Sequence, residues 1–249
     1  MKQPMKMQDF SRGLTPDQHE SYRSAGFITV RGVFLDDEVE RMRAECETLL
    51  GRPELFEQDI PEAAVRRDLN GDPVRDRLDP IASVSPLFAR TAADPRLVGL
   101  ASSIFGSPAQ LFKDKLIVKP PGVSGYAMHQ DYAYWEWTGI PATALVSVQV
   151  AIDDADTDNG AILFYPALHH GRLPAPADEP RDVDEAAIDL DTVSAGRTRA
   201  GDVILFHSLT PHKSDPNRSD RPRRVLYFSY NDASYGDWHG RYYRQRGDA

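Results

Sequence analysis

Cysteine is almost absent from this sequence. Cys46 is the single one, so no disulfide can form within the chain, which suits a reducing compartment, and we expect a cytoplasmic protein. Val39, Met42, Cys46 and Leu49 form one apolar stripe of a helical pattern. Cys46 is therefore predicted to fill the core rather than to act as a nucleophile.

Long apolar runs and an excess of basic residues are also missing. No run approaches the roughly 18 apolar residues that a membrane span needs. The first residues include Lys2 and Lys6 but lack the apolar segment of a signal peptide. The net charge of −9 argues against a nucleic-acid surface, which would need a basic stripe. We therefore expect no membrane partner and no nucleic-acid partner.

Capping and turn residues divide the 249 residues into a helical first part and a stranded second part. Helices are expected from Thr15 to Gly26, from Asp36 to Gly51 and from Asp94 to Gly106. Short strands are expected at 27–30, 110–119, 142–152, 161–165, 203–206 and 224–230. This order favours one α+β domain over residues 1–249, whose core is an antiparallel double-sheet jelly roll, also called a double-stranded β-helix.

Three segments lack a clear pattern. Residues 1–13 are expected to be a loose leader, and residues 241–246, rich in arginine, a solvated tail. Residues 52–90 carry little periodicity and would form an unusually long loop, which is typical either of a lid or substrate loop or of a solvated excursion. Its arginines, which could meet an anionic substrate, have acidic neighbours, so they do not decide between the two: Arg66, Arg67, Arg75 and Arg77.

The sequence around His129-Gln-Asp131 is the centre of the functional prediction. If this stretch is extended, the side chains at positions i and i+2 point to one face. An imidazole and a carboxylate side by side supply two of the three ligands of a ferrous iron site, and His212 is the best candidate for the third. Arg223, eleven residues after His212, opens an apolar run and could hold a carboxylate in a two-bond fork. A chain with seven histidines can also contain one His-x-Asp by chance.

Four ordered motifs resemble the phytanoyl-CoA dioxygenase family of iron(II)- and 2-oxoglutarate-dependent oxygenases, over roughly residues 15–230. The motifs are Lys119-Pro-Pro-Gly, His129-Gln-Asp131, Ala151-Ile-Asp-Asp with Asn159-Gly-Ala, and His212-x-Ser214-x-x-Asn217-x-Ser219-x-x-x-Arg223. The last motif is the most specific, because it fixes five residue types at set spacings.

The resemblance implies that His129, Asp131 and His212 bind iron. It also implies that Arg223 and Ser214 hold the distal carboxylate of 2-oxoglutarate. His207 competes with His212 for the third ligand position, but Ser214 and Arg223 keep the family spacing from His212. A set that uses His169 or His170 is a further alternative.

Two more residues are assigned to the cosubstrate by this resemblance. The position that matches Lys115 lines the 2-oxoglutarate pocket in the family, although Lys113, Lys115 and Lys119 on one face of a strand would ordinarily face solvent. Gln149 stands where several members have a tryptophan, and it could bond to the cosubstrate or to the substrate. The aromatic residues after the metal motif are expected to form either a substrate wall or core packing: Tyr132, Tyr134, Trp135 and Trp137.

The implied reaction uses iron(II), 2-oxoglutarate and O2 to hydroxylate a C–H bond of a small-molecule metabolite, with release of succinate and CO2. Related halogenases have glycine or alanine in place of Asp131, so a carboxylate there favours hydroxylation. Desaturation, cyclisation and epimerisation stay open, as does a non-oxidative metal-dependent jelly-roll enzyme, and a non-catalytic binding protein is the weakest alternative. The sequence selects neither the substrate nor the oligomeric state.

Overall fold

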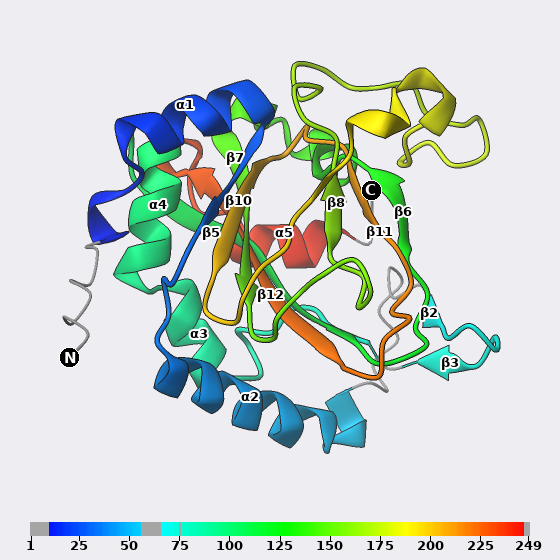
Figure 1. Ribbon diagram of the computed structural model, residues 1–249. Helices are drawn as coiled ribbons and strands as arrows, with labels where there is room; N and C mark the ends of the chain where they lie inside the picture. Colours follow the sequence, from blue (N-terminus) through cyan, green and yellow to red (C-terminus); the bar gives the residue numbers. More distant parts are fainter. Residues whose placement is uncertain (1–9, 56–65, 75, 247–249) are drawn as a thin grey trace, which may run out of the picture.

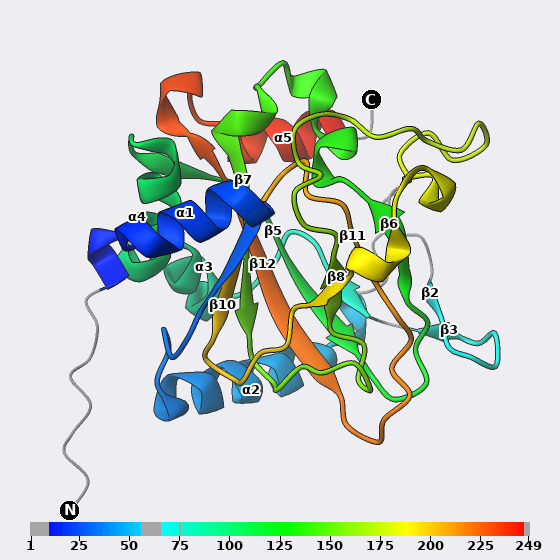
Figure 2. The same cartoon turned by 45° about the horizontal axis from the view of Figure 1, so that its top comes forward.

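The computed structural model describes residues 10–55, 66–74 and 76–246. Two antiparallel β-sheets face each other, and helices cover the outer side of the larger sheet (Figures 1 and 2). The larger sheet has the strand order β1-β10-β7-β12-β5-β4, and the smaller has the order β6-β11-β8-β9. This is the α+β jelly roll that the sequence predicts.

The strands pair residues that are far apart in the sequence. The larger sheet contains β1 (Phe27–Val30), β4 (Arg77–Leu78), β5 (Ala109–Lys119), β7 (Leu145–Ala151), β10 (Val203–His207) and β12 (Arg223–Asp232). The smaller sheet contains β6 (Tyr126–His129), β8 (Ile162–Phe164), β9 (Ser194–Ala195) and β11 (His212–Ser214). A separate hairpin pairs β2 (Arg66–Arg67) with β3 (Pro73–Val74).

The helices begin and end largely where capping residues predict. The described helices are α1 (Pro16–Ala25), α2 (Asp36–Leu50), α3 (Pro86–Ala92), α4 (Pro95–Phe105) and α5 (His239–Gln245). At the start of α1, Thr15 and Gln18 form the predicted capping box, and at its end Gly26 has a φ of 84° that glycine adopts without strain. Asp36 is the first residue of α2 rather than its cap, because Glu38 bonds to the backbone N–H of Leu35. None of the helices in the described ranges has both the length and the apolar character needed to cross a membrane.

Short 3-10 turns join these elements. They are η1 (Phe10–Arg12), η2 (Pro53–Leu55), η3 (Asp131–Tyr134), η4 (Glu136–Thr138), η5 (Ala142–Ala144), η6 (Glu185–Ala187), η7 (Leu190–Thr192) and η8 (Ala233–Tyr235). The turn η3 matters for function, because it begins at Asp131 directly after β6.

Strand alternation separates the core from the site. Val146, Val148 and Val150 of β7 are buried in the cluster that includes Met42 and Leu97 of the helices. Burying each such side chain contributes roughly 1.5–3 kcal/mol to stability. The residues between them on β7 therefore point the other way, toward the smaller sheet. The same alternation turns the lysines of β5 inward, and they do not face solvent as strand lysines ordinarily do.

The segment 52–90 differs from the expected loop. Its described part contains the hairpin β2–β3, strand β4 at the edge of the larger sheet, and helix α3. A strand of two residues is too short to show the alternation of apolar and polar residues, so the sequence did not predict β2, β3 and β4. Arg75 lies outside the described residues.

Both expected loose ends need correction where they are described. The last residues of the leader form η1 and pack against α4, where the backbone N–H of Leu14 donates to Ser103 Oγ at 3.1 Å. The arginine-rich tail forms most of α5, with Tyr242 buried. Arg246 is also buried and bonds to Asp79 Oδ1 at 2.9 Å, so this end is part of the fold.

Candidate active site

The predicted metal ligands come together at the meeting point of β6 and β11. His129 is the last residue of β6 and pairs directly with His212, the first residue of β11. Gln130 is extended, with φ −111° and ψ 125°, so it brings Asp131 to the same side as His129. One possible ligand atom from each of His129, Asp131 and His212 lies within 4.8 Å of the others. The three side chains are therefore close enough to bind one metal ion together.

Backbone carbonyls orient both imidazoles. The Nδ1 of His129 lies 2.9 Å from the carbonyl oxygen of Ala127, and the Nδ1 of His212 lies 2.9 Å from that of Thr210. Each Nδ1–H donates to its carbonyl, which leaves Nε2 free as the ligand atom. The Nε2 atoms lie 3.8 Å (His129) and 4.0 Å (His212) from Asp131 Oδ1.

Burial keeps this group in the protonation state that a metal requires. Burial, with the neighbouring His212, lowers the pKa of His129 to about 4, and burial also lowers the pKa of His212. Burial by itself would raise the pKa of Asp131, but His212 and Lys115 hold it below its usual value. Two neutral imidazoles and one carboxylate are the donor set of a non-haem iron(II) site.

Ser147 fixes the carboxylate of Asp131, and the sequence analysis missed this role. Its hydroxyl donates to Asp131 Oδ2 at 2.6 Å and lies 3.3 Å from the hydroxyl of Ser229 on the neighbouring strand β12. Oδ1 is thereby left for an ion. The available signal was a serine within the apolar run of β7, at a position whose neighbours are all buried.

The metal group opens into a cavity of about 390 Å³ between the two sheets. Arg223, Ser214 and Lys115 line this cavity, as the sequence predicts. Tyr134 and Trp135 also line it, whereas Tyr132 and Trp137 do not. The aromatic stretch after the metal motif therefore contributes both to the cavity wall and to core packing.

Arg223 is buried in this cavity with unsatisfied donors. It is 1% exposed, and its Nε and Nη1 have no hydrogen-bond partner in the part of the chain that the structure describes. A buried, unpartnered guanidinium is unfavourable unless a ligand completes it. Nε and a terminal nitrogen form the fork that matches a carboxylate.

Ser214 lies beside Arg223 and is held by a second buried cation. Lys119, which pairs with Arg223 across β5 and β12, donates from Nζ to Ser214 Oγ at 2.9 Å and to the carbonyl of Asp215 at 2.6 Å. Lys119 is 0% exposed. Two buried cations and a hydroxyl thus favour a carboxylate at this end of the cavity. The residues present fit both iron and a dicarboxylic cosubstrate.

Lys115 and Gln149 occupy different places. Lys115 lines the cavity with Nζ 5.0 Å from the ring centroid of Tyr227, and burial lowers its pKa to about 8. Gln149 does not line the cavity. Its Oε1 accepts a bond from the Tyr227 hydroxyl at 3.0 Å, while its Nε2 has no partner among the described residues. Tyr227, which motif spacing does not indicate, lines the cavity and links it to Gln149 through this hydrogen bond.

The rival histidines form a group of their own. The ring of His169 lies 4.4 Å from that of His170 and 5.4 Å from that of His207, centroid to centroid. The Nδ1 of His207 accepts the backbone N–H of Leu209 at 3.0 Å. In the described ranges, the possible metal ligands that gather are His129, Asp131 and His212 alone.

Part of the segment 52–90 reaches the cavity. Arg77 of β4 and Asp79 after it line the cavity beside Lys113 and Lys115. The segment therefore supplies part of the cavity wall. The side chains of Arg66 and Arg67 lie outside the described part.

A jelly roll that holds two histidines and an aspartate beside a cavity with a buried arginine defines the class of non-haem iron oxygenases that use a 2-oxo acid. The chain belongs to the phytanoyl-CoA dioxygenase (PhyH) family, whose model matches residues 22–225. The family resemblance, the fold class and the class of enzyme, an oxygenase dependent on iron and 2-oxoglutarate, are confirmed.

Named relatives agree with this assignment. Methylphosphonate hydroxylase of Gimesia maris is 36% identical over 146 residues, which are 59% of this chain and 54% of that protein. The alignment therefore spans only about half of that relative. Ectoine dioxygenase of Bordetella bronchiseptica is 28% identical over 242 residues, which cover 89% of this chain and 77% of the relative.

Solved structures share the architecture. EctD from S. alaskensis with 2-oxoglutarate and 5-hydroxyectoine has a TM-score of 0.74 at 24% identity, with 89% of this chain and 77% of that chain covered, and it shows the common fold. The epimerase SnoN in complex with Fe3+, alpha ketoglutarate and nogalamycin RO has a TM-score of 0.70 at 27% identity, with 87% and 83% covered.

Proposed function

We propose that this protein, with iron(II) bound, hydroxylates a C–H bond of a small-molecule metabolite and consumes one 2-oxoglutarate and one O2 in each turnover. The observation that carries the proposal is Arg223, buried in the same cavity as the His-Asp-His group with two donors unpartnered. Without a ligand, this guanidinium has two buried donors with no partner among the described residues. A cosubstrate with a distal carboxylate satisfies it.

Each ligand has assigned residues in this proposal. The Nε2 atoms of His129 and His212 and the Oδ1 of Asp131 hold the iron. The fork of Arg223 and the hydroxyl of Ser214 hold the distal carboxylate of 2-oxoglutarate. When bound together, iron and 2-oxoglutarate activate O2, with release of CO2 and succinate.

The residues of the chain position these groups and limit water access. Ser147 holds Asp131 so that one carboxylate oxygen faces the ion. Gln149 acts indirectly, because it holds the hydroxyl of Tyr227, a residue of the cavity wall, in place through a hydrogen bond. Phe206 and Ile162 line the same cavity and supply apolar surface near the metal group.

Asp131 favours hydroxylation over halogenation, because its carboxylate takes the position that a halide would need. The same chemistry can also be directed to epimerisation, as the name of SnoN shows for that enzyme. A metal-dependent hydrolase of jelly-roll fold is the second candidate. The unpartnered donors of Arg223 favour the oxygenase over it.

We also propose that residues 1–249 make one domain. Helices α1 to α4 and the larger sheet share one apolar cluster, and residues of both sheets share another. The relatives include enzymes named for methylphosphonate and ectoine, and we extend to this chain only the proposal of a small polar substrate.

The test is an anaerobic titration followed by a turnover assay. Protein loaded with iron(II) is titrated with 2-oxoglutarate, and binding is followed by the metal-to-ligand absorption band. Air is then admitted, and succinate is measured with and without candidate metabolites. The proposal predicts a saturable band and succinate release that a substrate stimulates. Absence of the band, with iron shown to be bound, would reject the cosubstrate.

A further inference from the structure

We infer that the substrate carries an oxyanion, a phosphonate or a carboxylate, and that Lys115 is its anchor in the cavity. This inference rests on the proposed function and adds the substrate class. Nothing in the resemblance or in the relatives' names assigns Lys115 to a substrate.

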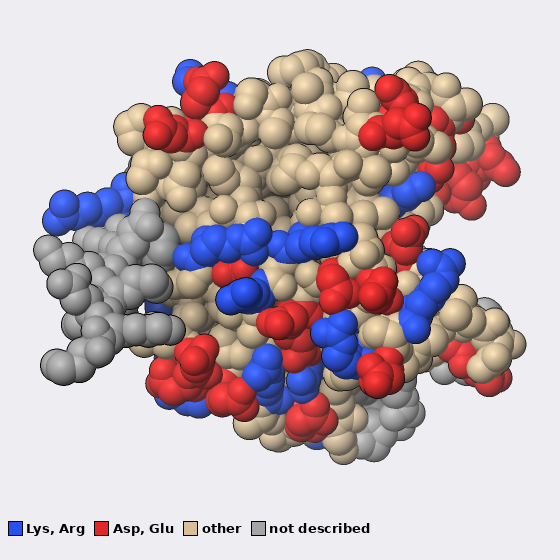
Figure 3. Space-filling model, in the orientation of Figure 1, with Lys and Arg blue, Asp and Glu red and all other residues tan. Residues whose placement is uncertain are grey.

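The cavity is cationic in a protein that is acidic. Among the described lining residues, six are lysine or arginine and three are aspartate, whereas the whole chain has a net charge of −9. The face of the molecule in Figure 3 carries both signs close together, whereas the residues that line the cavity carry an excess of positive charge. The two positive charges of iron(II) and the two negative charges of 2-oxoglutarate cancel. The excess is therefore still present when both are bound, and it favours an anion.

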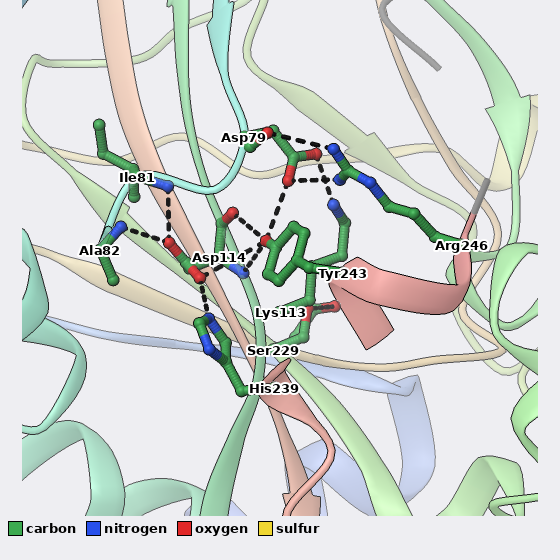
Figure 4. Close-up of polar contacts among 10 residues, drawn as sticks. Asp79, Ile81, Ala82, Lys113, Asp114, Ser229, His239, Tyr243 and Arg246 are labelled. Atoms are coloured by element: carbon green, nitrogen blue, oxygen red, sulfur yellow. Dashed lines mark hydrogen bonds and ion pairs between the residues drawn. The ribbon is translucent and has the colours of Figure 1, made fainter. Parts of the chain in front are cut away.

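Two of these cations already have carboxylate partners. Lys113 pairs with Asp79, which also accepts bonds from Arg246 and from the Tyr243 hydroxyl of α5 (Figure 4). Lys213 lies 2.9 Å from Glu185, nitrogen to oxygen. Arg223 is assigned to the cosubstrate. These three residues therefore offer little to a substrate.

Lys115 has no such partner. It lies two residues after Lys113 on β5, on the same face, yet its Nζ makes neither a hydrogen bond nor an ion pair with any residue in the described ranges. Its surroundings are the ring of Tyr227 and the charges of two carboxylates that are bonded elsewhere, Asp131 to Ser147 and Asp79 to Lys113. A half-buried ammonium without a carboxylate is unfavourable in the empty cavity, and an anionic ligand would relieve this.

The sheet register places Lys115 and Arg223 at different points along the strands, although the side chain of Tyr227 lies close to both. Arg223 pairs with Lys119, and Tyr227 pairs with Lys115, so the two anchors are four residues apart along the strands. Four residues correspond to roughly 13 Å of backbone. The four C–C bonds of 2-oxoglutarate span at most about 6 Å. With one end of the cosubstrate on Arg223 and the other on iron, we assign Lys115 to the substrate in place of the cosubstrate role that the resemblance implies.

Two arginines extend the positive field toward the cavity edge. Arg77 of β4 and Arg181 line the cavity together with Lys115, and the guanidinium of Arg181 lies 5.4 Å from the ring centroid of Tyr134. They would steer an oxyanion inward, and Lys115 would hold it beside the metal group. The proposal itself depends on Lys115.

The test compares matched charged and neutral compounds on the iron-loaded protein with 2-oxoglutarate. One arm uses methylphosphonate and its dimethyl ester, and the other uses propanoate and propanamide. Substrate-stimulated succinate release and binding are measured for each. We expect the charged member of at least one pair to bind and stimulate at least tenfold better than its neutral counterpart, and the responding arm identifies the oxyanion. Equal response within both pairs, or no response in either, would overturn the inference.

Variants then test the anchor. Lys115→Met should weaken the responding anion about 10- to 100-fold, the size of one lost charge-assisted bond, and should leave 2-oxoglutarate binding within about twofold. Lys115→Arg should restore most of the affinity. Arg221→Met is the matched control, because it removes an exposed cation paired with Asp156 outside the cavity. If Lys115→Met weakens 2-oxoglutarate as much as the anion, Lys115 belongs to the cosubstrate and the inference fails. Failure of wild-type protein to bind 2-oxoglutarate would instead reject the proposed function.

Discussion

His129 and His212 are direct cross-strand partners, with ring centroids 4.3 Å apart, although 83 positions separate them in the chain. The pairing of β6 with β11 brings both Nε2 atoms to one side of Asp131. The metal group therefore depends on the register of the smaller sheet. A shift of one residue would turn one imidazole to the opposite face.

The first prediction concerns the metal ligands. His129→Ala or His212→Ala should abolish succinate formation and weaken iron(II) binding by at least 100-fold, because two remaining ligands cannot hold the ion in an open site. Iron content after desalting and succinate release measure the effect. His170→Ala is the control, since His170 is exposed and lies outside the metal group. Turnover retained by either ligand variant would reject the assignment.

The second prediction concerns the cosubstrate clamp. Arg223→Ala should weaken 2-oxoglutarate by roughly 30- to 1,000-fold, as expected when one partner of a buried, charge-assisted pair is removed. Iron binding should change little, because Arg223 is not among the possible metal ligands. Anaerobic titration measures both affinities. A parallel loss of affinity for iron and for 2-oxoglutarate would point to a general structural role instead.

The third prediction concerns Ser147. Ser147→Ala removes the donor to Asp131 Oδ2, and we expect iron affinity to fall about 10- to 100-fold, as for other residues that orient a ligand. Ser229→Ala is the comparison variant, because Ser229 contacts Ser147 rather than Asp131. It should cause a smaller loss. Equal effects of the two variants on iron affinity would show that Ser147 does not act through Asp131.

The fourth prediction concerns pH and the cluster in Figure 4. Burial alone would raise the pKa of Asp79, but Lys113 and Arg246 hold it well below the usual value. Folding thus favours the charged carboxylate. Its contribution to stability is complete above about pH 4, the ordinary pKa of aspartate, and is lost as the pH falls through the lower pKa of the folded state.

The variant Asp79→Asn tests the direction of this pH dependence of stability. At pH 7 it should lower the free energy of unfolding by about 3–5 kcal/mol, because Lys113 and Arg246 are left without their carboxylate. As the pH is lowered below 4, the difference from wild type should shrink. Denaturant unfolding at several pH values measures it, with Asp37→Asn, in an exposed pair with Arg41, as the control. A constant difference at all pH values would contradict the linkage.

Local sequence patterns predicted much of the fold. The predictions that failed did so for physical reasons. The start of α1 and the apolar stripe of α2 follow from local chemistry, so they could be read directly. The tail at 241–246 was read wrongly, because α5 is short and its order comes from contacts of Tyr243 and Arg246 with β5 and Asp79. Strand β4, two residues long, is likewise defined by its pairing with β5.

The same division holds for the site. His129, Asp131, His212, Ser214 and Arg223 could be chosen from motif spacing, and the structure places all of them on one cavity. Ser147 and Tyr227 could not, since nothing in an apolar strand marks which polar side chain meets a ligand. Gln149 was assigned to the cosubstrate or the substrate by the family resemblance, and in the structure its Oε1 accepts a hydrogen bond from the Tyr227 hydroxyl.

The sequence by itself determined the residue types of the site and the alternation that sends the valines of β7 to the helices and Ser147 to the cavity. These follow from covalent chemistry and the two-residue period of a strand. Only the tertiary structure decided which histidines meet, which cations are neutralised and which one is left for a ligand. Burial and charge pairing depend on distances between strands, and those distances exist only once the sheets have closed on each other.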